Sequence, residues 1–149
     1  MRTDPRRLFR VVAVAEACTW ALLLVGMVLK YVTETTEVGV QVGGMLHGIA
    51  FVAYGVTTLV VAVDAGWTPR RTVIGLLAAV PPFTTIWFDV AMERRGALPG
   101  HWRLRGADPV SAPERVVATL VRRPVRGLAI GVAAVAVLTG AALLVGPPV

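Results

Sequence analysis

The chain has 149 residues, of which 56% are hydrophobic and 16% are charged, and its mean hydropathy is +0.70. A water-soluble domain carries about 25% charged residues to cover its surface, so these proportions exclude an ordinary soluble protein. The apolar residues fall into blocks of about twenty, the length that a helix needs to cross a hydrocarbon core of about 30 Å. The sequence therefore predicts an all-α protein, a polytopic transmembrane helical bundle.

The net charge of +6 comes from basic residues that cluster between the apolar blocks. In a soluble protein a pI near 11.0 favours a nucleic-acid partner. Here the placement is typical of side chains that contact the anionic headgroups of a lipid bilayer, so we expect no nucleic-acid partner. Cys18 is the only cysteine, which excludes an intramolecular disulfide and a cysteine-based zinc site.

The first predicted span covers residues 11–29 and follows a basic head. A cleaved signal peptide is the alternative for this block, but Glu16 interrupts its apolar region and no small-residue cleavage site follows. The second predicted span covers residues 39–63 and contains His47. Continuous apolar blocks of this length favour helices over the short alternating strands of a membrane barrel.

The third block covers residues 72–92 and is interrupted by Pro81 and Pro82. Each proline removes a backbone hydrogen-bond donor and breaks the helix. We expect one kinked span here. The alternative is a re-entrant block that returns to the side it came from, which requires protein or water to cover its non-helical backbone.

The rest of the chain divides into an arginine-rich interfacial segment over residues 96–126 and a fourth transmembrane helix over 127–146. Within the first of these, residues 113–123 are compatible with a short surface helix. We expect residues 1–95 to form a three-helix membrane domain, to which the fourth span is added at the C-terminal side.

Basic residues conflict with a topology of four simple spans. A cytoplasmic basic head then puts the arginine-rich segment outside, against the positive-inside rule, whereas the reversed orientation exports the head. The re-entrant alternative for residues 72–92 keeps the head, Arg70, Arg71 and the arginine-rich segment on one side. We expect a cytoplasmic N-terminus, because the first helix usually sets the orientation.

Three ionisable residues, Glu16, His47 and Asp89, lie within the predicted spans. Such a side chain at membrane depth costs about 2.5–3.5 kcal/mol on insertion scales, so each is a candidate functional position. In antiparallel helices Glu16 lies level with Tyr54, whose hydroxyl could donate to the carboxylate. His47 lies within a turn of Asp89 in depth, so an imidazole–carboxylate pair between the second and third spans is feasible, although we expect Asp89 to be interfacial.

Three roles are possible for the intramembrane polar side chains, which are Glu16, His47, Tyr54 and Asp89. They form hydrogen bonds between helices, they form a proton relay or a small-solute path, or they contact a partner protein. We favour the first role, in which neutral Glu16 and neutral His47 stabilise the bundle.

Small residues mark the expected helix-packing positions, because they let two helix backbones approach closely. Gly44 and Gly48 flank His47 with the small-x-x-x-small spacing, and a second such pair lies on the fourth span. The candidate packing residues are Gly43, Gly44, Gly48, Gly127 and Gly131.

Several motifs follow one another in the order of a known family. They are Phe9-Arg10 with Glu16, Leu29-Lys30-Tyr31, Gly44-x-x-His47-Gly48 with Phe51 and Tyr54, and Pro81-Pro82-Phe83 ahead of Trp87-Phe88-Asp89. Over residues 8–95 the chain resembles the HG-motif integral membrane proteins, domain-of-unknown-function family 3817, of actinobacteria and bacilli. The resemblance implies a three-helix membrane unit with Glu16 and His47 as shared features. It implies no activity, substrate or cofactor.

The sequence contains no phosphate-binding glycine loop, no His-x-x-x-His pair and no nucleophile elbow. We therefore expect no enzymatic activity, no metal and no cofactor. The favoured function is a non-enzymatic accessory or structural subunit of a bacterial plasma membrane, as a homo-oligomer or in a larger membrane complex. The alternative is a small proton-coupled transporter that uses Glu16 and His47.

Overall fold

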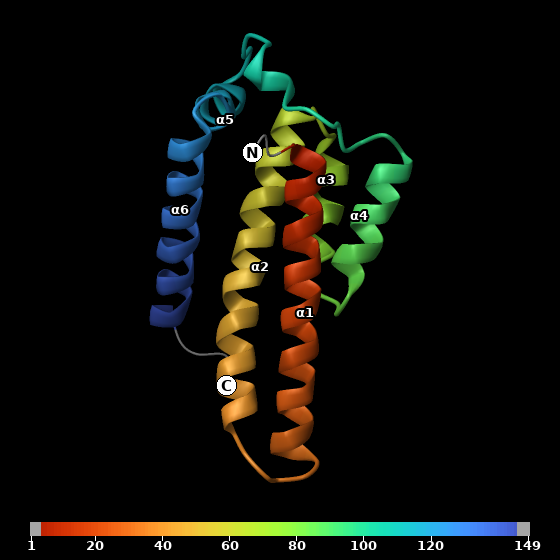
Figure 1. The fold of residues 1–149 in the computed structure, drawn as a ribbon, viewed down its shortest axis with the longest axis vertical. Helices are drawn as coiled ribbons and strands as arrows, with labels where there is room; N and C mark the ends of the chain where they lie inside the picture. Colours follow the sequence, from red (N-terminus) through yellow and green to blue (C-terminus); the bar gives the residue numbers. More distant parts are fainter. Residues whose placement is uncertain (1–3, 146–149) are drawn as a thin grey trace.

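The computed structural model describes residues 4–145, and all regular structure in them is helical (Figure 1). Two antiparallel helices of 27 residues each, α1 (Pro5–Tyr31) and α2 (Val38–Asp64), form the centre of the molecule. Two shorter helices, α3 (Pro69–Leu77) and α4 (Thr84–Arg94), pack against one half of this pair. The predicted all-α membrane bundle is confirmed.

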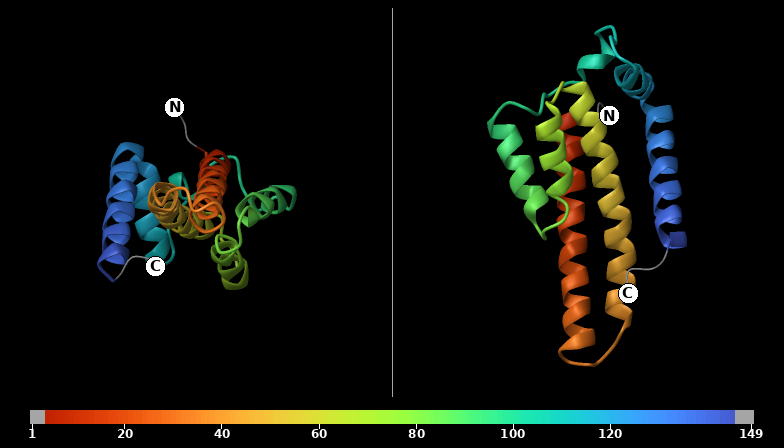
Figure 2. Two further views of the ribbon diagram at one scale, coloured as in Figure 1. Left: turned by 90° about the horizontal axis from the view of Figure 1, so that it is seen from below. Right: turned by 180° about the vertical axis from the view of Figure 1, so that it is seen from behind.

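The polar segment that follows contains a short 3-10 turn, η1 (Arg103–Arg105), and the helix α5 (Ala112–Arg122). Helix α6 (Pro124–Val145) then runs beside α2, on the side opposite to α3 and α4 (Figures 1 and 2). Three of the described helices are long and apolar enough to cross a membrane, namely α1, α2 and α6.

The expected single kinked span over residues 72–92 is wrong. The chain forms α3, turns at Pro81 and Pro82 near mid-height, and returns as α4 to the end it came from (Figure 2). We call α3, the turn and α4 the hairpin. Two adjacent prolines lack the backbone donors that a continuing helix needs, and Phe83 adopts a left-handed φ of 65° just before α4 begins. The structure therefore matches the re-entrant alternative.

This topology also removes the conflict over the basic residues. The starts of α1, α3 and α6 and the end of α4 all lie at the same end of the bundle as η1 and α5 (Figure 1). Every arginine in residues 4–145 belongs to these parts, whereas Lys30 lies at the opposite end of α1. We call the first end the arginine end.

Capping side chains begin α1, α3 and α5 at the arginine end. The Asp4 side chain accepts a hydrogen bond of 2.7 Å from the Arg7 N–H, with Pro5 in the first turn of α1. Ser111 accepts a hydrogen bond from the Glu114 N–H at the start of α5. Three apolar residues further along this helix are buried. A surface helix is thus present at Ala112–Arg122, one residue earlier than the sequence suggested.

The core lies in the half of the bundle that the hairpin covers. Four aromatic rings, those of Phe9, Tyr54, Trp67 and Phe88, contact one another with centroids 5.5–6.2 Å apart. The hairpin does not reach the other half, so there α1 and α2 have no neighbouring helix on that side (Figures 1 and 2). None of the residues of α6 is buried.

Candidate functional site

Polar side chains line the contact between α1 and α4, and we call this contact the polar seam. Its members from α4 are Thr85, Asp89 and Glu93, whose spacing of four places them on one helical face. Its members from α1 are Arg6, Arg10 and Glu16. The seam runs from the arginine end into the centre of the bundle.

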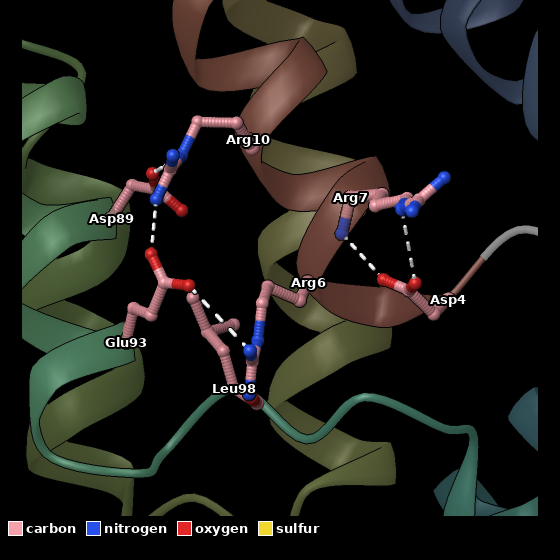
Figure 3. Close-up of polar contacts among 7 residues, drawn as sticks. All are labelled: Asp4, Arg6, Arg7, Arg10, Asp89, Glu93 and Leu98. Atoms are coloured by element: carbon pink, nitrogen blue, oxygen red, sulfur yellow. Dashed lines mark hydrogen bonds and ion pairs between the residues drawn. The ribbon is translucent and has the colours of Figure 1, made fainter.

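Ion pairs form the outer part of the seam (Figure 3). The Arg10 guanidinium donates to Asp89 through Nε and to Glu93 through Nη2. Arg6 lies 3.6 Å from Glu93 and donates to the carbonyl of Leu98 in the loop after α4. Asp89 is fully buried, so Arg10 supplies the charge that its carboxylate needs inside the protein.

Glu16 forms the inner part of the seam and is also fully buried. Its Oε2 lies 2.7 Å from the hydroxyl of Thr85, which lies 3.2 Å from the carbonyl oxygen of Ala13. Its Oε1 has no hydrogen-bond partner among the described residues. Close by, the indole of Trp20 donates to the carbonyl of Ala79 and ties the tip of the hairpin to α1.

The two predicted pairings of polar residues are wrong. The Tyr54 hydroxyl donates to the carbonyl of Gly75 at 3.0 Å, and not to Glu16. His47 lies against α1, with its Nδ1 3.3 Å from the Thr19 hydroxyl and its ring centroid 4.4 Å from that of Trp20. Matching depths identified residues at similar heights, but not the direction in which each helix face points.

Asp89 is fully buried within the protein, and its expected interfacial depth in the membrane stays a prediction. The hairpin brings α4 against the start of α1, so the carboxylate meets Arg10 and is covered. In the sequence Arg10 belongs to the basic head and to the Phe9-Arg10 motif, and its pairing with Asp89 was not predicted. One signal in the sequence could have paired the two helices. Asp89 and Glu93 lie four residues apart, as do Arg6 and Arg10, and the two pairs have opposite charges.

The candidate packing glycines have different surroundings. A Cβ on Gly43 would lie 3.0 Å from the Leu23 backbone, and one on Gly127 would overlap the backbone of Leu120, so these two are close contacts. Gly44 meets only the end of a side chain at 3.9 Å. Gly48 and Gly131 have nothing within 4 Å, so the structure gives them no packing role within residues 4–145.

A close approach of the α1 and α2 backbones was missed. A Cβ on Gly26 would overlap the backbone of Gly39, near the loop that joins the two helices. The residues lie thirteen positions apart on either side of that loop, and their pairing follows from the antiparallel hairpin of two long helices.

A second polar cluster, also missed, fastens the arginine-rich segment to the end of α2. The buried carboxylate of Asp64 accepts hydrogen bonds of 3.0 Å from the N–H groups of Arg103 and Leu104. The Arg103 guanidinium returns a bond of 2.7 Å to the carbonyl of Asp64 and pairs with Glu114 of α5. Arg103, with the Val110 N–H, holds the pKa of Glu114 below its usual value.

The described residues contain no group of three or more His, Cys, Asp or Glu side chains that converge as metal ligands. An open groove on the outer face of α4 is lined by apolar residues with arginines at its end: Trp87, Val90, Ala91, Arg94 and Arg95. The polar seam instead brings ion pairs and a buried carboxyl group together inside the protein.

Comparison with known proteins gives the same class of molecule. A Streptomyces coelicolor protein named as a membrane protein is 53% identical over 108 residues, which are 72% of this chain. The chain spans 12% of the length of that protein. No solved structure matches. The family model described as Domain of unknown function (DUF3817) matches residues 6–94, which include the polar seam and the hairpin, and the chain belongs to this family.

Proposed function

We propose that the chain is a non-enzymatic accessory module of a bacterial plasma membrane that packs against a larger membrane complex or against copies of itself. The observation that carries this proposal is the use of the buried polar groups. Asp89 binds Arg10, Thr85 contacts Glu16, and the Tyr54 hydroxyl donates to a backbone carbonyl. These contacts join helices of the same chain, so they stabilise a fold.

The length of the related Streptomyces coelicolor chain supports a modular role. The Streptomyces coelicolor relative matches over only 12% of its length, so a similar unit is one part of a much longer chain there. The apolar surface of this chain supports the same interpretation, because α6 buries none of its residues and large apolar side chains of α1 and α2 are exposed. Lipid or the helices of a partner would cover these faces.

The arginine end supports an orientation. Because basic residues concentrate on the cytoplasmic side of a plasma membrane, we place this end, with the start of α1, in the cytoplasm. The arginines of η1 and α5 would then contact the anionic headgroups of the inner leaflet. The end of α6 would lie on the other side.

A proton-coupled carrier is the second candidate, and one observation favours it. Glu16 is fully buried near the middle of α1 and one of its carboxyl oxygens has no partner among residues 4–145. A carboxyl group that is not fully used in the fold is available to bind a transported ion or a proton.

Two measurements on the full-length protein separate these candidates. Affinity purification of the tagged chain in mild detergent, followed by cross-linking and mass spectrometry, should recover an oligomer or a partner in fixed stoichiometry. In vesicles with an internal pH dye, the native chain, Glu16→Gln and His47→Ala should give the same proton permeability. A monomer whose proton flux is abolished by Glu16→Gln would replace the accessory role by the carrier.

A further inference from the structure

We infer that Glu16 is a proton-binding site whose proton joins α4 to α1, so that the site is occupied while the hairpin is docked and empties when the hairpin moves away. This goes beyond the accessory role proposed above, since it assigns a ligand, the proton, to one carboxyl group. The inference rests on burial, on hydrogen-bond geometry and on the position of charges around that group.

The three fully buried carboxyl groups in residues 4–145 differ in their partners. Asp64 accepts two backbone N–H bonds and lies against Arg103, and Asp89 binds Arg10. Asp89 Oδ1 also lacks a partner, but each group has strong donors for its ionised form, a guanidinium for Asp89 and two backbone N–H groups for Asp64. Glu16 contacts one hydroxyl group and has no partner at Oε1. An isolated carboxylate in an apolar interior is so costly that the group takes up a proton instead.

The hydrogen-bond distances around the Thr85 hydroxyl support a protonated Glu16. Its hydroxyl oxygen lies within bonding distance of Glu16 Oε2, at 2.7 Å, and of the Ala13 carbonyl oxygen, at 3.2 Å. A hydroxyl carries one hydrogen and can donate to only one of these two acceptors. Both contacts become hydrogen bonds if Glu16 donates its proton to Thr85 while Thr85 donates to Ala13.

The groups that face Glu16 from the packed helices leave it without a cation. From α1, Arg10 is engaged by Asp89 and Glu93 of α4. The Trp20 indole donates to the carbonyl of Ala79 and also lies within hydrogen-bonding reach of Glu16, but it carries no charge. From α2, Tyr54 donates to Gly75, and His47 lies against Thr19. From α4, Asp89 and Glu93 are acidic and supply no cation.

The proton also couples the site to the hairpin, because Glu16 belongs to α1 and Thr85 belongs to α4. If Glu16 loses its proton, Thr85 must donate to the new carboxylate and release the Ala13 carbonyl. The carboxylate then stays buried with only uncharged donors until water reaches it. Separation of α4 from α1 provides that water, so ionisation of Glu16 and docking of the hairpin disfavour each other.

Infrared spectroscopy of the full chain in lipid vesicles tests the protonation directly. At neutral pH we expect a C=O stretching band of a protonated carboxylic acid, which shifts on isotope labelling of the glutamate carboxyls and is absent from Glu16→Gln. Glu37→Gln, which changes an exposed carboxylate, should keep the band. A native spectrum without the band, or a band that survives in Glu16→Gln, would overturn the inference. The isotope shift reads the native chain, so the test stands if the variant fails to fold.

Hydrogen–deuterium exchange tests the coupling. From neutral to alkaline pH, the protection factors of the amides of α4 should fall in the native chain, because ionised Glu16 favours the undocked hairpin. They should stay level in Glu16→Gln, which cannot ionise. An equal fall in both chains, or none in either, would overturn the coupling. The accessory role is tested by co-purification, so its failure would not be confused with either result.

Discussion

Asp89 of α4 and Arg10 of α1 lie 79 residues apart in the sequence and form an ion pair in which the carboxylate is fully buried. The pair exists because the hairpin turns at two prolines and brings the end of α4 back to the start of α1. The ion pair therefore forms only while the hairpin is packed against α1.

Removal of either member should destabilise the bundle. Asp89→Ala leaves Arg10 without its buried partner and Arg10→Ala leaves a buried carboxylate, so each should lower the free energy of unfolding by about 1–3 kcal/mol. The double variant should lose less than the sum of the single losses. Reversible unfolding in bicelles measures these values. Arg7→Ala is the matched control, since the Arg7 side chain is 84% exposed, and it should cost under about 1 kcal/mol.

The glycines of α1 and α2 should differ sharply when a methyl group is added. Gly26→Ala places a Cβ against the backbone of Gly39, so it should cost about 1–3 kcal/mol by pushing the two helices apart. Gly48→Ala meets nothing within 4 Å and should be neutral or stabilising by about 0.5–1 kcal/mol. Thermal unfolding of both variants in one detergent makes the comparison, and equal losses would contradict it.

Docking of α5 should weaken in acid. Arg103 lowers the pKa of Glu114, so the carboxylate contributes stability above the ordinary glutamate pKa, and this stability is lost as the pH falls through the lowered pKa. Hydrogen exchange over Ala112–Arg122 should therefore rise at acidic pH. Glu114→Gln should show the faster exchange already at neutral pH and little further change. A native chain without this pH dependence would contradict the role of the pair.

The proposed orientation can be tested with single cysteines in a Cys18→Ala background. Val110, before α5, and Val32, at the opposite end of α1, are 84% and 74% exposed, so substitution disturbs little packing. In intact cells a membrane-impermeant maleimide should label Val32→Cys and leave Val110→Cys unlabelled until the cells are opened. Labelling of Val110→Cys in intact cells would reverse the orientation.

Much of the architecture follows from local properties of the sequence. The apolar blocks predicted the long helices α1, α2 and α6, and the prolines at 81 and 82 marked the break in the third block. Ser111 and Pro113 marked the start of α5. The motifs over residues 8–95 identified the family, and the match of the family model to residues 6–94 confirms it.

The contacts of the candidate site could not be read in the same way. Depth in the membrane placed Glu16 level with Tyr54 and His47 level with Asp89, yet neither pair forms. Pairing also depends on the rotation of each helix about its axis and on whether the third block crosses or returns. A return moves α4 from the far side to the start of α1, which exchanges His47 for Arg10 as the partner of Asp89.

The sequence by itself determined that the chain is helical and belongs in a membrane, because in lipid each segment must satisfy its own backbone hydrogen bonds and expose apolar side chains. Only the tertiary structure decided which polar groups meet. Those contacts join residues far apart in the chain, and their geometry depends on how the hairpin packs against α1, a choice that no local pattern of residues encodes.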